Sequence, residues 1–579
     1  MFKKTKIICT LGPSTDKPKI LEDMLEAGMN ICRFNFSHGS HQEQGERIRM
    51  LRDASANTNI KAALLLDTRG PEMRLGIFAE GKVRLVAGQK FIVTARDIVG
   101  TKEIATVNHK FLPQEVAVGA TILLSDGLVS LYVDAIQGED IITTVQNSGE
   151  ISNRKRVAVP GTSLDLPFMS EQDKADILFG VEQDMDFIAA SFVQRAADVL
   201  SIRKLLESVD VHMDIIAKIE NAEGVKNIDE ILKVADGIMV ARGDLGVEIP
   251  TEEVPIVQKM LIKKCNAVGK PVITATQMLE SMMNNPRPTR AEASDIANAI
   301  IDGTDCIMLS GETASGQYPV ESVQTMARIA IRTEGSLEFK MLSTSQCTTT
   351  DAISHATVQV ARELNAAAII TATEHGYTAR MVSKYRPQAV ILAVTPHEKT
   401  IRRIMMLWGV QPVLGVNAKN SDDMVRDAIT RTVEQGFVKE GDLVVITAGV
   451  AAGMSGTTNM IRVHVVGKIL LRGAGIGQRS VTGKVCVVRS MEDLTHKMQP
   501  GDIIVIAGVD EETAVYAAKA GAIIAEEGGF TSNAAIVGIT SGIPVIVGVD
   551  GAVASLTDGL IVTVDTARGI VYQGEINAR

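Results

Sequence analysis

A lysine and two acidic residues stand where two strand-like segments of the sequence end. Lys218 and Glu220 are two residues apart at the end of one apolar run, and Asp244 follows the next run. Alternate residues of a strand point to the same face, so Lys218 and Glu220 can reach one ligand. Two carboxylates leave most of an octahedral Mg²⁺ shell open to water and substrate oxygens. The spacing therefore predicts a divalent-cation site with a lysine beside it.

Two catalytic roles are possible for Lys218. An ammonium group beside a bound cation can stabilise a developing enolate without becoming a nucleophile. A strand-end lysine can also form a Schiff base with a keto substrate, as in an aldolase. The neighbouring carboxylates favour the enolate role, and a carbon–carbon lyase stays as the enzymatic alternative.

Other strand-like segments also end in polar residues. Four of these residues offer hard oxygen donors that would suit a weakly bound monovalent cation, although ordinary hydrogen bonding explains them about as well: Asn35, Ser37, Asp67 and Thr68. The other polar residues at the strand ends are Arg33, Arg242, Thr276, Ser310 and Glu312. A purely structural fold would not need such a ring of polar side chains, so the ring indicates a catalytic site.

Eight short apolar runs position these residues, and amphipathic stretches such as 17–27 and 196–209 separate them. The runs are 6–11, 30–36, 62–67, 187–192, 215–219, 237–241, 272–276 and 306–310. Strands that alternate with helices pair in parallel through right-handed crossovers. Eight such units close a (β/α)₈ barrel, whose catalytic residues gather at the carboxyl ends of the strands. Periodicity alone leaves an open sheet possible.

The pattern changes at several points along the chain. Short alternating runs between turn residues predict an all-β lid inserted after the third strand, above the mouth of the barrel. New α/β units follow residue 345. The glycine-rich segment Gly473–Gly477 predicts a linker before a last unit rich in Gly, Val and Ile. We expect barrel segments at 1–70 and 167–345, the lid at 71–166, an α/β regulatory domain at 346–473 and a final unit at 474–579.

The amino-acid composition limits the cellular location and the classes of binding partner that we expect. Of 579 residues, 45% are hydrophobic and 3% aromatic, which suits aliphatic cores of helix-covered parallel sheets. The net charge of −10, with dispersed basic residues, argues against nucleic acid or an anionic membrane as the main partner. No apolar run reaches the ~20 residues of a membrane span, and no leader is expected. Six dispersed cysteines without a CxxC pair favour buried, reduced thiols and a cytoplasmic location.

Seven sequence motifs resemble those of the pyruvate kinase family in order and spacing, and they cover residues 1 to about 473. They are Thr5–Pro13, Arg33–Gly39, Asp67–Glu72, Ile216–Asn221, Met239–Gly246, Ile273–Glu280 and Met308–Thr313. The resemblance implies transfer of the phosphoryl group of phosphoenolpyruvate to ADP, which gives pyruvate and ATP in glycolysis. It also implies a homotetramer.

The resemblance implies a role for each matching residue. Lys218 would stabilise the enolate, Arg33 would bind the transferring phosphoryl group, and Glu220 with Asp244 would hold Mg²⁺ or Mn²⁺. The substrate carboxylate would be held by Gly243, Asp244 and Thr276. A proton relay would involve Thr276, Ser310 and Glu312. K⁺ would be bound by Asn35, Ser37, Asp67 and Thr68, and the nucleotide by Asn35, His38, Arg74 and Lys155.

Three further positions refine the comparison with the family. A glutamate at position 72 accompanies K⁺ dependence, whereas a lysine there would supply the charge of the cation, so Glu72 predicts activation by K⁺. Arg69 stands where a lysine is usual. The segment Arg156–Gly161 replaces the family's Gly-Val-Asn-Leu-Pro-Gly, and both changes lie near the hinge of the lid.

The regulatory unit contains a loop that is similar to the family's effector loop. It precedes a helix expected to begin near Thr378, and helix N-termini bind phosphate. The predicted effector residues are Thr373, Glu374, His375, Gly376, Tyr377 and Thr378, with 453–459 closing over the ligand. Glu374 adds negative charge, which favours a sugar or nucleotide monophosphate over a bisphosphate. A non-enzymatic sensor that uses this loop is the alternative from another functional class.

The last unit resembles the mobile phosphohistidine domain of phosphoenolpyruvate-using enzymes, through Gly528–Ala535 and Gly542–Gly548. The family's phosphate-carrying histidine falls at Asn533. Because an amide cannot replace that nucleophile, we expect a structural or regulatory domain without a carrier role.

Overall fold

The computed structural model describes residues 2–162, 166–338, 348–417, 420–449 and 458–576. Eight parallel strands close a barrel in the order β1-β17-β16-β15-β14-β13-β3-β2. Their bounds are β1 Lys6–Thr10, β2 Ile31–Asn35, β3 Ala63–Asp67, β13 Phe187–Ala190, β14 Asp214–Ile219, β15 Gly237–Ala241, β16 Val272–Ala275 and β17 Cys306–Leu309. The predicted (β/α)₈ barrel is therefore confirmed, and the open sheet is excluded.

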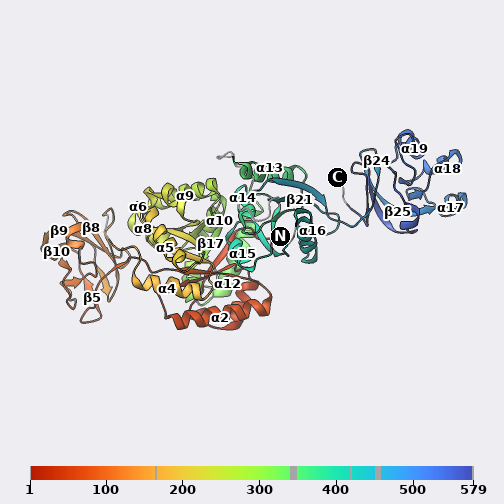
Figure 1. Cartoon of the computed structure of the whole chain (residues 1–579). Helices are drawn as coiled ribbons and strands as arrows, with labels where there is room; N and C mark the ends of the chain where they lie inside the picture. The colour runs from red at the N-terminus through yellow and green to blue at the C-terminus, as the bar shows by residue number, and fades with distance from the viewer. Residues whose placement is uncertain (1, 163–165, 339–347, 418–419, 450–457, 577–579) are drawn as a thin grey trace. The chain divides into compact units, whose positions relative to one another are not determined.

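Helices cover the outside of the barrel (Figure 1). Those with at least seven residues are α1 Pro18–Glu26, α2 His41–Thr58, α4 Glu171–Glu182, α5 Ala196–Ser208, α7 Ile228–Val234, α8 Arg242–Glu248, α9 Val254–Val268, α10 Arg290–Asp302 and α12 Pro319–Glu334. Capping boxes begin α2 at Ser40, α4 at Ser170 and α10 at Thr289. Alternate strand residues pack in two apolar layers, one inside the barrel and one beneath these helices.

A region of β-strands with one short helix, α3 Leu112–Glu115, lies between β3 and α4 in the sequence. Its main sheet has the order β4-β12-β8-β9-β10-β6-β7, and β11 pairs with β5. The bounds are β4 Met73–Arg74, β5 Lys82–Leu85, β6 Lys90–Thr94, β7 Ile104–Thr106, β8 Thr121–Leu124, β9 Val129–Gln137, β10 Asp140–Val145, β11 Gly149–Ser152 and β12 Arg156–Ala158. Alternating burial along β5, β8 and β10 matches the period-two pattern of the sequence.

A five-stranded sheet, which follows the barrel in the sequence, has the order β20-β19-β18-β21-β22. Its strands are β18 Ala368–Ala372, β19 Val390–Thr395, β20 Val410–Leu414, β21 Leu443–Ala448 and β22 Met460–Val465. The helices of this part are α13 Thr349–Glu363, α14 Tyr377–Lys384, α15 Glu398–Arg403 and α16 Ser421–Glu434. Strands β18, β19 and β21 pair in parallel, as expected for α/β units.

The C-terminal sheet has eight strands in the order β23-β30-β29-β25-β26-β27-β28-β24. They are β23 Ile469–Arg472, β24 Ala474–Ile476, β25 Ser480–Val488, β26 Ile503–Ile506, β27 Ala522–Ala525, β28 Val545–Val547, β29 Ile561–Asp565 and β30 Ile570–Gln573, with α17 Met491–His496, α18 Glu511–Ala517, α19 Asn533–Ser541 and α20 Ala552–Ser555.

The prediction of a linker at Gly473–Gly477 is wrong. Ala474–Ile476 forms β24 at the edge of the C-terminal sheet, where it pairs antiparallel with β28. A Cβ added at Gly475 would lie 1.9 Å from the carbonyl oxygen of Thr566. Glycine is therefore needed at position 475 because two backbones approach closely there. It does not indicate a flexible linker.

The described chain divides into two compact units. One comprises Met1–Ser345 with Ala379–Arg386 and His397–Pro412, and the other comprises Gln346–Thr378, Pro387–Pro396 and Val413–Arg579. Within the described ranges, none of the helices is long and apolar enough to cross a membrane. Five cysteines are buried free thiols: Cys9, Cys32, Cys265, Cys306 and Cys486. Cys347 lies outside the described residues.

Candidate active site

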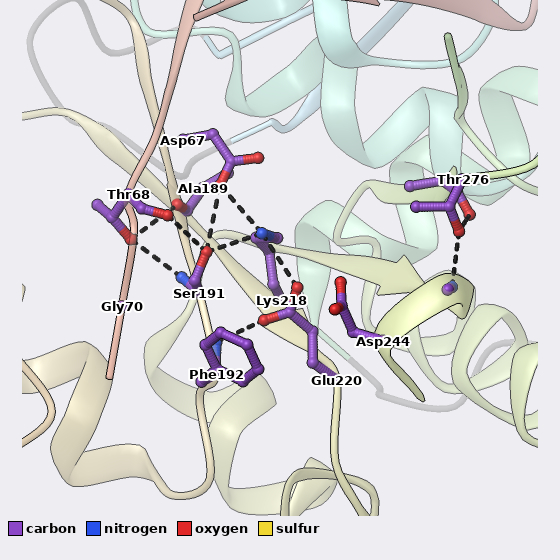
Figure 2. Close-up of polar contacts among 12 residues, drawn as sticks. Asp67, Thr68, Gly70, Ala189, Ser191, Phe192, Lys218, Glu220, Asp244 and Thr276 are labelled. Carbon is purple, nitrogen blue, oxygen red and sulfur yellow. Dashed lines mark hydrogen bonds and ion pairs between the residues drawn. The ribbon is translucent and has the colours of Figure 1, made fainter. Parts of the chain in front are cut away.

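The ammonium group of Lys218 is buried at the carboxyl end of β14 among oxygen atoms from neighbouring strands (Figure 2). Its Nζ lies 3.0 Å from Asp67 Oδ1, 2.7 Å from Ser191 Oγ and 3.0 Å from Glu220 Oε1. The other carboxylate oxygen of Asp67 accepts a hydrogen bond of 2.5 Å from Arg33 Nε. Asp67 thus joins the two cations that the sequence assigned to the enolate and to the phosphoryl group.

These contacts determine the charge of the lysine. Burial alone would lower the pKa of Lys218, but the carboxylates of Asp67 and Glu220 outweigh it and raise the pKa above its ordinary value. For Asp67, burial acts to raise the pKa, whereas the charges of Arg33 and Lys218 lower it overall. Lys218 is therefore cationic at neutral pH. A Schiff base requires a neutral amine, so this environment favours the enolate role over the lyase alternative.

Glu220 and Asp244 provide the two carboxylates that the sequence assigned to a divalent cation. Glu220 is 1% exposed, and its Oε2 accepts a 2.7 Å hydrogen bond from the backbone N–H of Phe192. Burial raises the pKa of Glu220 to about 7, Lys218 opposes this shift, and Asp244 adds to it. Figure 2 draws both side chains. Asp244 lies in the first turn of α8.

This pair fits a Mg²⁺ or Mn²⁺ ion that completes its shell with water and substrate oxygens. Among the described residues there is no group of three or more His, Cys, Asp or Glu that could form a closed metal site. Two hard carboxylates without a closing third ligand are the donor set expected of an ion that must also contact substrate.

Thr276 follows β16 in a left-handed backbone conformation, with φ of 69°, and Gln277 after it has φ of 54°. Such values are rare for a β-branched residue and mark a functional or strained segment. The hydroxyl of Thr276 accepts a 2.8 Å hydrogen bond from Gly243 N–H. Arg242 holds the segment in place by donating to the carbonyl oxygens of Ala275 and Thr276, at 3.1 and 2.6 Å.

Glu312 is a buried carboxylate that joins the ends of two strands. Its Oε2 accepts a 2.8 Å hydrogen bond from Ser310 N–H, and its Oε1 accepts one of 3.0 Å from Leu279 N–H. The side chain is 3% exposed. These contacts fix Glu312 beside Ser310 and the loop that follows β16.

The four candidate K⁺ ligands come from β2 and β3 and the residues directly after them. Asn35 and Asp67 are partners in the strand register. Asn35 Oδ1 accepts a hydrogen bond of 3.0 Å from Ser37 N–H, and the Thr68 hydroxyl accepts one of 3.1 Å from Ser191 N–H. Both oxygens of Asp67 are engaged by Arg33, Lys218 and Ser191. The side-chain oxygens of Asn35, Asp67 and Thr68 therefore already accept hydrogen bonds from protein groups.

The four candidate nucleotide ligands belong to two segments. Asn35 is the last residue of β2, His38 lies three residues later, and the side chain of His38 is exposed. Arg74, on β4, donates from Nε to Glu72 at 2.9 Å and from Nη1 to the carbonyl oxygen of Arg154 at 2.9 Å. Lys155 is exposed next to β12, and its backbone carbonyl accepts from Leu75 N–H. Asn35 and His38 therefore belong to the barrel, whereas Arg74 and Lys155 belong to the lid.

Comparison with known proteins decides the family. Residues 2–323 match the pyruvate kinase barrel domain, and residues 351–464 match the pyruvate kinase alpha/beta domain. The pyruvate kinase of Geobacillus stearothermophilus is 53% identical over 582 residues, which cover 99% of each chain. The pyruvate kinase of Staphylococcus aureus (strain MRSA252) is 47% identical over 583 residues and 100% of each chain. The chain belongs to the pyruvate kinase family.

A solved structure supports the same assignment. A pyruvate kinase from Cryptosporidium parvum superposes with a TM-score of 0.75 and 38% sequence identity, covering 80% of this chain and 96% of that one. Membership of this family makes the chain a phosphotransferase. Residues 498–569 match the mobile domain of PEP-utilising enzymes, which confirms the resemblance of the last unit.

The predicted effector loop lies between β18 and α14. The buried hydroxyl of Thr373 accepts a 3.0 Å hydrogen bond from Gly376 N–H, which tightens the loop. The Glu374 carbonyl accepts a 3.2 Å hydrogen bond from Thr395, and the Thr378 hydroxyl lies 2.8 Å from that of Thr458. His375 lies in the same loop, and Tyr377 begins α14. Of the segment 453–459, residues 453–457 lie outside the described residues.

Asn533 is the first residue of α19, and its side chain is exposed. The next amides of this helix already have acceptors within the protein. Ala534 N–H donates to Glu527 Oε1 at 2.8 Å, and Ala535 N–H donates to the Ser532 hydroxyl at 3.3 Å. The helix start is therefore capped by its own side chains, with an amide at the position where the related carrier domains have histidine.

Sequence reasoning missed two residues at the barrel mouth. The Ser191 hydroxyl accepts from Lys218 and contacts the carbonyl oxygen of Thr68 at 2.7 Å. Ser191 lies at the end of the fourth strand run, so the strand-end rule could have found it. Arg156 forms an ion pair with Asp244. No local sequence pattern predicts this ion pair, because the two residues are far apart in the sequence.

Proposed function

We propose that this chain transfers the phosphoryl group of phosphoenolpyruvate to ADP, giving pyruvate and ATP, with a divalent cation and K⁺ as cofactors. The observation that carries the proposal is the buried ammonium of Lys218, held between Asp67, Ser191 and Glu220 at the mouth of the barrel. A cation fixed there before the reaction can stabilise negative charge that develops on a substrate oxygen.

Each step has a side chain of suitable chemistry. A terminal phosphate oxygen of ADP attacks phosphorus, the bond from phosphorus to the bridging oxygen breaks, and the electron pair stays on the enolate oxygen beside Lys218. Arg33 binds the transferring group with its donor fork. The Gly243 and Asp244 amides and the Thr276 hydroxyl hold the substrate carboxylate. The enolate then takes a proton from water at its methylene carbon, through a relay that involves Thr276, Ser310 and Glu312.

Two cation sites support these steps. Glu220 and Asp244 would hold Mg²⁺ or Mn²⁺, which when bound neutralises charge on the phosphate and carboxylate of the substrate. K⁺ would be held by Asn35, Ser37, Asp67 and Thr68. The nucleotide would contact Asn35, His38, Arg74 and Lys155. K⁺ is proposed as an activator because position 72 carries a glutamate, where a lysine would supply the charge of the cation.

Regulation, assembly and location form the finer part of the proposal. The loop Thr373–Thr378 would bind a phosphorylated effector, for which Glu374 favours a monophosphate. We further propose a cytoplasmic homotetramer that acts in glycolysis, with domain boundaries after residues 70, 166, 345 and 473. The last unit would act in structure or regulation. Protein-bound label after incubation with ³²P-labelled phosphoenolpyruvate would contradict that role, because Asn533 supplies no nucleophile.

The test is pyruvate release from phosphoenolpyruvate and ADP, followed with Mg²⁺ and K⁺ present and with each omitted in turn. We expect release that needs both ions, with little activity when Na⁺ replaces K⁺. Full activity in Na⁺ alone would contradict the K⁺ proposal. No release under any cation condition, from folded protein, would contradict the enzymatic proposal and favour the sensor. Borohydride trapping of Lys218 with a keto acid would favour the lyase instead.

A further inference from the structure

Arg156 connects the lid to the barrel mouth through its side chain. It is the first residue of β12, and its Nη1 forms an ion pair with Oδ1 of Asp244. Its Nη2 lies 3.9 Å from Glu248 Oε1, and its guanidinium carbon lies 4.8 Å from the centre of the Phe192 ring. The residue is 7% exposed. The guanidinium group is therefore held by two carboxylates and an aromatic face, and is not a solvated surface charge.

The surroundings of this side chain are acidic. Burial lowers the pKa of Arg156, but the charges of four carboxylates outweigh burial and raise it: Asp244, Glu220, Glu72 and Glu248. Two of these carboxylates are the proposed ligands of the divalent cation. The guanidinium thus supplies positive charge at the position where the ion would bring its own.

The sequence makes this arrangement a property of this chain. The motif that Arg156–Gly161 replaces begins with glycine in the family, and glycine has no side chain that could reach Asp244. Arg154, two residues earlier in the turn before β12, is exposed. Of these two arginines, Arg156 is the one whose guanidinium contacts Asp244.

We propose that Arg156 is a lid-borne counter-ion of Asp244 that competes with the divalent cation for this carboxylate, and so sets the affinity of the metal site and links the lid to its occupancy. The inference rests on the proposed metal site at Glu220 and Asp244. A Mg²⁺ ion bound to the Asp244 carboxylate would weaken the ion pair with Arg156, because the two cations would repel each other and share the charge of one carboxylate. Glu248 offers Arg156 a second carboxylate when it leaves Asp244.

The experiment measures Mn²⁺ binding to the full-length protein without phosphoenolpyruvate or nucleotide, from the free-ion signal in electron paramagnetic resonance. Arg156→Gly and Arg156→Gln should each bind Mn²⁺ about tenfold more tightly than the wild type, since each removes the competing charge. Arg156→Lys keeps a positive charge and should lie between them and the wild type. Arg154→Gly is the matched control for loss of one lid charge and should bind as the wild type does.

A second measurement reports on the lid itself. In the wild type, saturating Mg²⁺ should increase amide hydrogen exchange in Arg156–Ala158, because the lid loses its link to Asp244. In Arg156→Gln the exchange should already be faster and should not respond to Mg²⁺. Retained exchange protection elsewhere in the lid sheet checks that the variants are folded.

The outcomes separate this inference from the proposed function. Unchanged or weaker Mn²⁺ binding in both Arg156→Gly and Arg156→Gln would overturn it, as would equal tightening in Arg154→Gly. If the wild type binds no Mn²⁺, or if Asp244→Asn binds it equally well, the proposed metal site fails and the inference fails with it.

Discussion

Acidic side chains lie at both ends of the barrel strands, but their partners differ. At the amino ends, three aspartates directly precede β13, β15 and β17, and each accepts a backbone N–H from the adjacent strand: Asp186, Asp236 and Asp305. Each of these aspartates also accepts a hydrogen bond from an arginine, which is Arg402, Arg203 and Arg386 respectively. Asp214, at the start of β14, is bound by both Nε and Nη2 of Arg403.

At the carboxyl ends the acidic residues pair with cationic side chains of the proposed active site and of the lid. Asp67 pairs with Arg33 and Lys218, Glu220 pairs with Lys218, and Asp244 pairs with Arg156. The amino-end pairs tie strands to backbone and so stabilise the barrel. In the proposed function, the carboxyl-end pairs hold charges that substrate and metal would exchange. The same residue types would then serve stability at one end and chemistry at the other.

The largest expected difference between the two ends is in activity. Asp67→Asn should lower kcat/KM by about 10²–10³-fold, because a neutral amide leaves Arg33 and Lys218 without their shared carboxylate. The amino-end change Asp236→Asn is the matched control and should keep most of the activity. Initial rates of pyruvate release measure both, with circular dichroism to confirm folding. Equal losses in the two variants would remove the proposed distinction.

The second expected difference is in stability. Arg403→Met should lower the stability of the barrel by about 2 kcal/mol, because it leaves the carboxylate of Asp214 without its two charged hydrogen bonds. Arg195→Met is the control, since Arg195 is 59% exposed and lies 3.7 Å from Asp198. Scanning calorimetry should show a lower unfolding temperature for Arg403→Met alone. A large loss of activity at temperatures where the variant is folded would contradict a purely structural role.

The pH dependence of stability sharpens the same comparison. Burial acts to raise the pKa of Asp214, but hydrogen bonds from His212 and Arg403 outweigh it and lower the pKa from 3.8 to about 2. A lowered pKa means that the stabilisation is present above pH 3.8 and is lost as the pH falls towards about 2. The unfolding free energies of the wild type and Asp214→Asn should therefore converge over this range. A constant difference from pH 6 to pH 2.5 would contradict the assignment.

Much of the barrel could be predicted from the sequence, because each strand combines an apolar run with a polar residue at its end. The runs 62–67 and 237–241 correspond to β3 and β15 within one residue. The proximity of Lys218 and Glu220 followed from the two-residue repeat of a strand, and their side chains lie 3.0 Å apart. Local rules were sufficient wherever one strand placed both groups.

The sequence failed where the contact joins distant segments. The glycines around Gly475 led to the prediction of a linker, whereas close packing of two backbones explains Gly475. The hydrogen bonds from Arg242 to the loop after β16 depend on the packing of two strand ends, and the contact of Arg156 with Asp244 depends on the position of the lid. Such features need the tertiary structure, because periodicity carries no information about which residues meet across the mouth.

The most direct test of the account replaces Lys218 by methionine and measures pyruvate release from phosphoenolpyruvate and ADP with Mg²⁺ and K⁺. Lys226→Met is the control, since the side chain of Lys226 is 75% exposed on the outside of the barrel. Lys218→Met should lower kcat by at least about 10²-fold with an intact fold, because the developing enolate loses its buried cation. Lys226→Met should have wild-type activity. Retention of wild-type kcat by Lys218→Met would contradict the central claim.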